Sequence, residues 1–446
     1  MEKTFRPWEV DQVWLFPPSV RDLVPDGDLA HVVRDLVRDE LDLSAIHATY
    51  TELRGQPPYH PTMMTALLLY CCCRGIYSSR KIEGACRERV DVMAVTAMAT
   101  PDHDTIATFR RRHRDALGGL FAQVLVLCRE AGIVRMGHVA LDGTKVKANA
   151  SKHRAMSYAR MSKAEHEIEE VVRQWFDEAE RVDAEEDALY GKGRRGDEMP
   201  DWARTKAGRL KRIREAKARI EARAKEEAER VKAQREAKEK ERGKPLSGPK
   251  PRALEGQPDP KSQSNFTDPD SRILRVGGTY EQAYNCQAAV DAERQVIVSQ
   301  HVVARQNDHE ELGPTLAQIE EVLGELPREL SADSGYCSED NLALLEDRGV
   351  RAYVATGRQK HGTRTPTSGD TRGHGSLTQA MRTRLRRGGW RSRYRLRKHT
   401  VEPVFGQIKA CRGWTQFLHR GIESVRAEWT LICTAHNLLK LAAARA

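Results

Sequence analysis

The chain has 446 residues, of which 74 are Lys or Arg and 64 are Asp or Glu, giving a formal net charge of +10. This length favours two to four domains, and a hydrophobic content of 39% is enough for a sizeable core, which excludes a wholly disordered chain. No apolar run approaches the ~18 residues that a membrane span needs, and the N-terminus lacks the pattern of a signal peptide, so we expect a cytoplasmic protein without a membrane partner.

The first 135 residues have the pattern of short helices joined by tight turns. Apolar residues recur at helical spacing from Leu29 to Leu36, Pro61 can begin a second helix, and Ser78 can cap a third. A further helix near Asp104 ends in three arginines. This pattern is typical of a helix-turn-helix-like module, and it fits other small helical bundles nearly as well.

A strand and a long charged segment follow. The apolar run 138–141 ends at Asp142, which predicts a buried strand with an acid at or near its end. Residues 151–243 are dominated by Ala, Glu, Lys and Arg, which indicates a charged helical hairpin interrupted near 191–200. Its heptad pattern is irregular, so we favour a solvated insertion over an assembly arm. Residues 244–272 are rich in Pro, Gly and Ser and predict a flexible linker.

Strands and helices mix in the last third of the chain. Alternating apolar residues at 284–290 and 296–302 predict a β-hairpin. An amphipathic helical pattern over 312–323 follows, and then a short strand that ends at Asp333. Residues 352–355 predict one more strand. The order indicates a mixed sheet that helices cover.

Three acids, Asp142, Asp333 and Glu402, can converge at one edge of this sheet. The two aspartates end strands, and Thr400 can cap a helix that carries Glu402 in its first turn. Such a cluster repels itself unless a cation neutralises it, and Mg²⁺ takes carboxylate, water and phosphate oxygens. The sequence therefore predicts a Mg²⁺ site for phosphoryl transfer, with Mn²⁺ as a plausible substitute.

A basic segment lies between the last two of these acids. Residues 358–398 contain thirteen Lys or Arg residues and one acid, Asp370. Positive charge concentrated in one part of a balanced chain is typical of proteins that bind a phosphate backbone. Trp390 and Tyr394 lie among the arginines, whose side chains suit both phosphate contact and base stacking. We therefore predict nucleic acid as the partner, in preference to a solvated basic tail.

The segments around these residues resemble those of bacterial insertion-sequence transposases of the DDE, ribonuclease H-like superfamily. The acidic motifs are HVALDGTKVKANAS around Asp142, LSADSGYCSEDN around Asp333 and RKHTVEPVFGQIK around Glu402, and TYEQAYNCQAAVD precedes the hairpin. Three early segments resemble the amino-terminal domain of one large branch of the family: FRPWEVDQVWLFPPSVRDLVP, LRGQPPYHPTMMTALLLY and TPDHDTIATFRRRHRDAL. The resemblance covers about 1–150 and 264–443.

The resemblance implies a division of the chain into domains. A helical N-terminal transposase domain that binds DNA is expected over 1–135. A ribonuclease H-like catalytic domain with a mixed sheet is expected over 136–150 and 273–446. The charged helical insertion (151–243) and the linker (244–272) would then interrupt the catalytic domain after its first strand.

The resemblance also implies an activity. Asp142, Asp333 and Glu402 would bind two Mg²⁺ ions, water would cut one strand at each transposon end, and the freed 3′-hydroxyl would attack target DNA. The partners would be double-stranded DNA of the transposon ends and of the target. A homodimer is expected because two ends must be paired.

Several further residues are candidates for contacts with DNA: Lys409, Arg397, Arg395, Lys145 and Trp390. Cations close to the cut would neutralise phosphates, and Trp390 would either stack on an unpaired base or, equally, serve as a packing residue. The last motif of the family is often Tyr-x-x-Arg-x-x-x-Glu. Here Tyr394 and Arg397 lie one residue earlier than this spacing from Glu402.

Two other functions fit the same residues. A catalytically decayed transposase would act only as a DNA-binding protein, and the presence of all three acids argues against it. A stand-alone metal-dependent nuclease would cut without strand transfer, and the acids alone do not distinguish it from a transposase. Terminal inverted repeats flanking the gene would favour the transposase.

Overall fold

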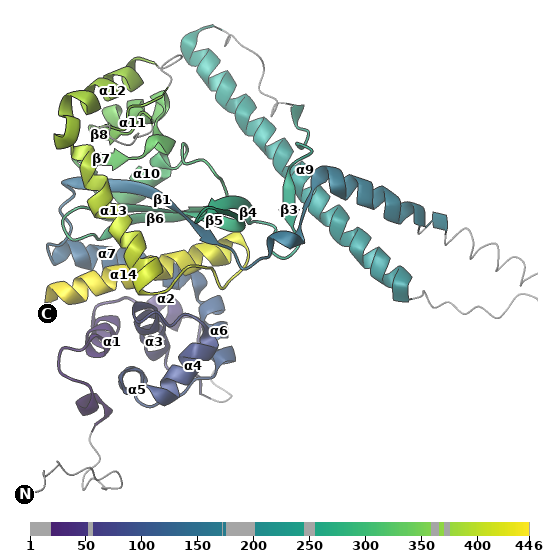
Figure 1. Cartoon of the computed structure of the whole chain (residues 1–446). Coiled ribbons are helices and arrows are strands. Elements are labelled where there is room, and N and C mark those ends of the chain that lie inside the picture. The colour runs from purple at the N-terminus through teal and green to yellow at the C-terminus, as the bar shows by residue number, and fades with distance from the viewer. Residues whose placement is uncertain are drawn as a thin grey trace, which may run out of the picture.

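The computed structural model describes residues 19–51, 57–171, 173–174, 201–244, 255–357, 365–369 and 375–445. Within these ranges the chain is rich in helix and contains a six-stranded mixed sheet and a separate two-stranded sheet. The larger sheet lies in the middle of the body, the N-terminal helices pack below it, and a helical arm projects to one side (Figure 1).

The N-terminal helices begin where the sequence supplies capping residues. The side chains of Asp28, Ser78 and Asp102 each accept a hydrogen bond from a backbone N–H in the first turn of a helix, which satisfies donors that a helix start leaves free. The helices predicted in this part of the chain are confirmed. The elements are η1 (Val20–Leu23), α1 (Leu29–Asp39), α2 (Ser44–His47), α3 (Pro61–Cys73), α4 (Ser79–Glu88), α5 (Val90–Thr96), α6 (His103–Arg112) and α7 (Arg114–Glu130).

The larger sheet has both antiparallel and parallel pairs. Its strands are β1 (His138–Lys147), β4 (Arg272–Val276), β5 (Thr279–Asp291), β6 (Ile297–Val303), β7 (Glu329–Ala332) and β8 (Arg351–Val354). β1 and β6 both pair antiparallel with residues 285–290 of β5, so they lie on opposite edges of it. β7 pairs parallel with β1 and with β8. The order is therefore β6–β5–β1–β7–β8, with β4 on the first part of β5, and the predicted hairpin and short strands are confirmed.

Helices cover both faces of this sheet. Ser299 and Gln300 are neighbours on β6 and point to opposite faces. Ser299 Oγ donates to Gln318 of α10 (Leu312–Leu323), whereas Gln300 Nε2 donates to Thr430 of α14 (Ile422–Arg445). The helix predicted over 312–323 is thus confirmed, and α10 and α14 lie in different layers.

α14 joins the N-terminal helices to the sheet. Asn437 on this helix accepts a hydrogen bond from Ile297 N of β6, and its backbone carbonyl accepts one from Cys128 Sγ of α7. The carbonyl of Ala435 accepts from Cys73 Sγ of α3. One continuous cluster of buried apolar residues extends from Val24 through the sheet to Leu441. The N-terminal helices and the sheet therefore share a core through α14.

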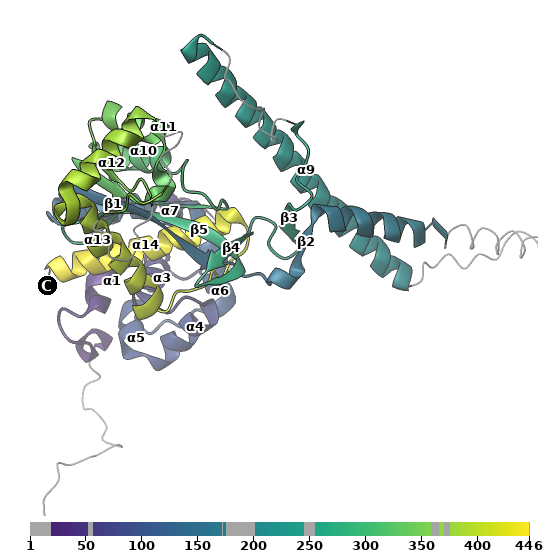
Figure 2. The ribbon, with the colours of Figure 1, turned by 45° about the horizontal axis from the view of Figure 1, so that its top comes forward.

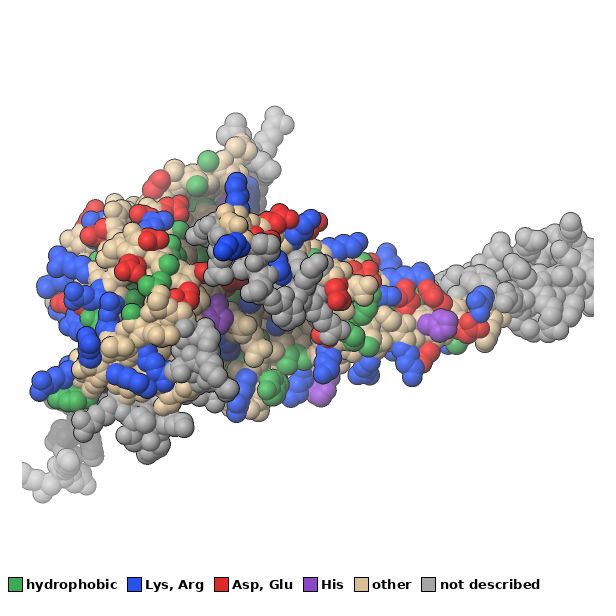
Figure 3. All heavy atoms as spheres, turned by 90° about the horizontal axis from the view of Figure 1, so that it is seen from above, with side chains coloured by type: hydrophobic (Ala, Val, Ile, Leu, Met, Phe, Trp, Pro, Cys, Tyr) green, Lys and Arg blue, Asp and Glu red, His purple; other side chains and the backbone are tan. Residues whose placement is uncertain are grey.

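The charged insertion forms the projecting arm (Figure 2). Residues 158–171 are helical, and they pack against α9 (Asp201–Arg242) in a small core of Met161, Ile213, Ala216 and Ile220. Basic and acidic side chains alternate along the arm (Figure 3). The predicted helical hairpin is confirmed for these residues, and its predicted interruption near 191–200 lies outside the described ranges. No helix in the described part of the chain is long and apolar enough to cross a membrane.

The end of the predicted linker differs from the expectation. β3 (Gln263–Asn265) pairs with β2 (Ala155–Ser157) at the base of the arm. Asp268 is fully buried and accepts a hydrogen bond from Tyr284 of β5 at 2.8 Å. Prolines and polar residues predicted flexibility here, but these polar side chains find partners on the sheet and are fixed by them.

Candidate active site

Asp142 and Asp333 lie side by side because of the strand register. β1 and β7 run parallel, and Leu141 is paired with Ala332. The next residue of each chain segment is an aspartate, so both side chains leave the backbone at the same level and on the same face. The structure therefore brings together two of the three acids that the sequence singles out.

Asp142 lies in the middle of its strand, not at or near the end as the sequence predicts. β1 continues to Lys147 because β5 pairs with it along its whole second half. β7, in contrast, ends at Ala332. The Asp142 carboxylate therefore lies where the sheet loses one neighbour, and its side chain is still only 14% exposed.

Asp333 is held by the turn that follows β7. Its Oδ1 accepts a hydrogen bond of 2.8 Å from Gly335 N at the start of η4 (Ser334–Tyr336). Tyr336 is fully buried, and its hydroxyl donates to Gln287 Oε1 of β5. The Asp333 carboxylate is thus fixed by the backbone of a turn whose aromatic residue is anchored in the sheet.

Glu402 lies in the second turn of α13 (Leu396–Gly406). The predicted cap at Thr400 is wrong, because Thr400 is a buried residue inside this helix. The preceding η6 (Arg393–Arg395) runs directly into α13 and already supplies helical backbone before Thr400. The Glu402 side chain is 49% exposed, which makes it the most accessible of the three acids.

Pro403 is consequently an interior proline and not a first-turn residue. Proline has no N–H, so the carbonyl of His399, four residues earlier, loses its helical partner. Gln295 Nε2 donates to this carbonyl at 3.1 Å. The side chain of Gln295 therefore replaces the missing helical hydrogen bond and ties α13 to the β5–β6 turn.

Arg397 connects two of the acids. Its Nη1 lies 3.4 Å from Asp142 Oδ2 and 3.2 Å from Glu402 Oε1. The side chain is only 12% exposed, so the guanidinium points into the protein. Burial raises the pKa of the Tyr394 hydroxyl, and the neighbouring Arg397 opposes this rise. Both residues thus lie at the acidic site, although each is one position early in the family spacing.

The charge on Asp142 is unfavourable in this environment. Burial raises the pKa of its carboxyl to about 7, Arg397 opposes the rise, and the nearby carboxylate of Asp333 adds to it. A buried carboxylate beside a second carboxylate needs a positive charge to remain ionised. Arg397 supplies part of that charge, and the raised pKa indicates that it does not supply all of it.

This raised pKa predicts a pH dependence of stability. The folded protein keeps a proton on Asp142 up to about pH 7, whereas the unfolded chain releases it near pH ~4. The contribution of Asp142 to the free energy of unfolding therefore falls as pH rises between these values. In metal-free protein, Asp142→Asn should raise the melting temperature at pH 8 and change it less at pH 5. An equal change at both pH values would contradict the assignment.

Two family models match the chain. The model described as "Transposase DDE domain" matches residues 261–438, and the model described as "Transposase domain (DUF772)" matches residues 18–112. The chain belongs to the insertion-sequence DDE transposases. No curated protein and no solved structure matches it. The first match contains Asp333 and Glu402, whereas β1 with Asp142 lies outside both matches and is joined to them by strand pairing.

The acidic residues of this DDE transposase are of the type that binds a divalent cation. Carboxylate oxygens are the ligands that Mg²⁺ takes, usually from one or two side chains together with waters and phosphate oxygens. The pair Asp142 and Asp333 meets that requirement, because the strand register sets the two carboxylates side by side. Among the described residues, no three His, Cys, Asp or Glu side chains are gathered closely enough to hold a metal together. Arg397 lies between Asp142 and Glu402 in this arrangement.

Asp308 is a fourth carboxylate at this site, which the sequence analysis missed. Its Oδ1 accepts hydrogen bonds from Asn285 Nδ2 at 2.6 Å and Gln287 Nε2 at 2.7 Å, both on β5. Lys145 Nζ lies 3.5 Å from the same oxygen. Asp308 follows β6 in a polar stretch with other acids, so periodicity gave no signal for it. Only strand pairing brings it behind Gly143, next to Asp142.

Gly143 makes this close approach possible, and its replacement is expected to disturb the site. A Cβ at this position would lie 2.7 Å from Gln287 Nε2 and 3.1 Å from Asp308 Oδ1. Gly143→Ala should therefore displace both side chains, cost about 1–3 kcal/mol of stability, and lower DNA cleavage. Gly118→Ala is the control, because Gly118 lies in α7 with open space at that point. Full stability and activity in Gly143→Ala would show that the contact is dispensable.

The predicted DNA-binding residues separate into two groups. Lys409 Nζ donates to Thr144 Oγ1 at 2.6 Å and to the carbonyl of Lys145 at 2.9 Å, so it ties η7 (Gln407–Cys411) to β1. Lys145, like Arg397, faces a carboxylate. Trp390, in contrast, is 57% exposed, and Arg395 lies over its ring at 6.0 Å. Lys145 and Arg397 thus lie at the acids and Lys409 lies against β1, whereas Trp390 and Arg395 are available on the surface.

Proposed function

We propose that this transposase binds the ends of its own element and catalyses Mg²⁺-dependent strand cleavage and strand transfer. The observation that carries the proposal is the parallel register that sets Asp142 beside Asp333. The strand order β6–β5–β1–β7–β8, with the first three strands antiparallel and the last two parallel to β1, supports a ribonuclease H-like catalytic domain. Glu402 joins the pair through Arg397.

Each residue of the site has a task in this reaction. A bound Mg²⁺ ion would neutralise charge on the transferring phosphate and activate the attacking oxygen. Asp142 and Asp333 would hold the cation, and Glu402, as the most exposed acid, would complete the site from α13. Arg397 keeps Asp142 and Glu402 oriented toward each other through its two ion pairs. Lys409 holds α13 and η7 against β1, so that the acids keep their relative positions.

DNA of the transposon ends and of the target is the proposed substrate. The basic segment supports this, since Trp390 is exposed and the guanidinium of Arg391 lies 5.1 Å from the centre of its ring. An aromatic ring flanked by arginines can stack on a base while the cations contact phosphate. We further propose a homodimer on paired ends and a location in the cytoplasm, with DNA recognition by 1–135 and catalysis by 136–150 with 273–446.

The test uses purified full-length protein and end-labelled duplex DNA that carries the terminus of the element. Cleavage at the terminus with Mg²⁺ or Mn²⁺, none with EDTA, and joining of the cut end to a second duplex are expected. Cleavage without joining would favour a stand-alone nuclease. Binding without cleavage under either metal would favour a decayed transposase that only binds DNA.

A further inference from the structure

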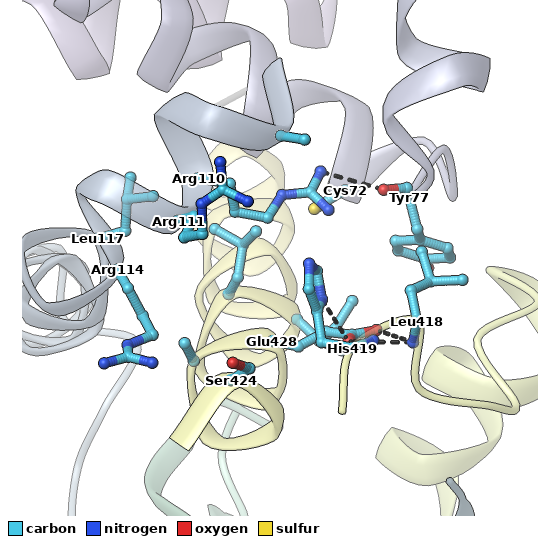
Figure 4. Close-up of a pocket in the computed structure, with 14 residues that line it drawn as sticks. Cys72, Tyr77, Arg110, Arg111, Arg114, Leu117, Leu418, His419, Ser424 and Glu428 are labelled. Carbon is cyan, nitrogen blue, oxygen red and sulfur yellow. Dashed lines mark hydrogen bonds and ion pairs between the residues drawn. The ribbon is translucent and has the colours of Figure 1, made fainter. Parts of the chain in front are cut away.

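A cavity of about 230 Å³ lies between the N-terminal helices and α14, away from the acidic site. One side is formed by the end of α6 and the start of α7, and the other by α14 with the loop before it. Figure 4 shows Arg110 on one side of this cavity and the pair His419 and Glu428 on the other. None of these residues takes part in the proposed cleavage.

The inner wall of the cavity is apolar. Leu117 of α7 and Leu431 and Ile432 of α14 line it, and all three side chains are buried in the shared core. An apolar wall of this kind favours a flat, weakly polar body over water. A small inorganic anion alone would gain nothing from these side chains.

The rim of the cavity is strongly basic. Arg110, Arg111 and Arg114 follow each other within five residues at the junction of α6 and α7, and all three line the cavity. Arg110 Nη2 donates to the carbonyl of Tyr77 at 3.1 Å, while its Nε is buried without a partner among the described residues. Arg111 is exposed. The exposed Arg111 is therefore placed to meet a negative group at the mouth, and Arg110 adds positive charge inside the cavity.

The opposite side supplies polar groups in a fixed orientation. Glu428 is 8% exposed and accepts hydrogen bonds from Trp414 Nε1 and from the backbone of Leu418 and His419. Its Oε2 also forms a hydrogen bond of 2.9 Å with His419 Nδ1. The His419 ring is thus fixed at the cavity, where it can meet the polar edge of a bound ring.

We propose that this cavity takes a single unpaired nucleotide, with the base against the apolar wall and the phosphate on the arginines of the rim. The inference rests on the proposed binding of DNA, because α6 belongs to the helical part of the chain for which DNA recognition is proposed. A base flipped out of a duplex presents the required combination of flat ring, polar edge and adjoining phosphate. A free nucleotide has the same chemistry, so the test separates these two sources.

The test compares two labelled duplexes that differ by one unpaired adenine, with fluorescence anisotropy as the measure of binding. The wild-type protein should bind the duplex with the unpaired base about tenfold more tightly, since one stacked base is worth about that much. Ala427→Phe places a large ring in the cavity, because Ala427 lines it on α14. This variant should lose the preference while it binds the fully paired duplex as the wild type does.

Two further variants distinguish a loss of the binding preference from misfolding. Arg111→Gln changes an exposed side chain and should reduce the preference without lowering the melting temperature. Arg87→Gln removes a cation of α4 that is 59% exposed and does not line the cavity, and it should keep the preference. Equal binding of both duplexes by the wild type would overturn this inference and leave the proposed function standing. Failure to bind either duplex would overturn both.

A separate competition experiment tests whether the cavity binds a free nucleotide. Deoxyadenosine monophosphate is added as a competitor to the duplex with the unpaired base. The proposal expects no competition at concentrations near the Kd of the duplex, because the rest of the DNA contributes most of the binding. Strong competition that Ala427→Phe abolishes would show a site for free nucleotides and would overturn the assignment to DNA.

Discussion

Replacing Asp142 or Asp333 by alanine is expected to reduce metal-dependent cleavage of terminal DNA by about 10³-fold or more. The two carboxylates lie side by side through the pairing of Leu141 with Ala332, so each variant removes half of the proposed cation site. Loss of several kcal/mol of charge stabilisation corresponds to this range, since 1.36 kcal/mol is about tenfold in rate. Single-turnover cleavage of end-labelled DNA at saturating Mg²⁺ measures the effect.

This loss can be separated from loss of folding or of DNA binding. Asp142→Ala should not lower the melting temperature at pH 8, because the ionised Asp142 carboxylate is itself unfavourable there. Both variants should still shift the terminal duplex in a gel. Asp347→Ala, which changes an exposed acid of α11 (Glu339–Asp347), is the matched control and should cleave normally. Normal cleavage by Asp142→Ala or Asp333→Ala would exclude these residues from the site.

The core of the site was predictable because its signals are local. Asp142 follows the apolar run 138–141 and Asp333 follows the short segment 330–332, and short segments of this kind bounded by turn residues are typical of buried strands. The position of Glu402 was harder, because the start of α13 depends on η6 and on the contact between Gln295 and His399. That contact joins residues far apart in the sequence, and no pattern near Pro403 indicates it.

Asp308 and the shared core could not be predicted, for the same reason. Asp308 gains its place only because Gly143 has no side chain and because β5 carries Asn285 and Gln287 at the facing positions. The sequence of α14 indicates one apolar face, but polar residues elsewhere on it, such as Asn437, are also fully buried. Their partners come from β6 and α7. Contacts of this kind follow from the assembled fold and not from periodicity.

Arg397 has contacts that the sequence did not indicate. A basic residue near a cut is expected to contact phosphate, but Arg397 is 12% exposed and faces two carboxylates. It therefore acts in this structure as the positive charge of the acidic site. A divalent cation would neutralise the same carboxylates as the guanidinium of Arg397. Removing Arg397 should therefore change how much the cation stabilises the protein.

Replacing Arg397 by alanine is accordingly expected to destabilise the metal-free protein and to increase its response to Mg²⁺. Removing one partner of a buried ion pair costs about 3–5 kcal/mol when the remaining charge stays ionised. Asp142 can take up a proton instead, so the loss should be larger at pH 8 than at pH 5. Thermal unfolding with Mg²⁺ or EDTA at both pH values measures these changes.

Two further variants make the result specific to the position of the charge. Arg397→Lys keeps a positive charge near Asp142 and should fall between the alanine variant and the wild type. Arg393→Ala removes a neighbouring arginine that is 53% exposed and paired with Glu329, so it should cost at most ~1 kcal/mol at either pH. Mg²⁺ should raise the melting temperature of Arg397→Ala more than that of the wild type, because the cation then replaces the missing guanidinium. If Mg²⁺ stabilises both proteins equally, Arg397 and the cation do not share the carboxylates, and the metal site must lie on the Asp333 side of the cluster.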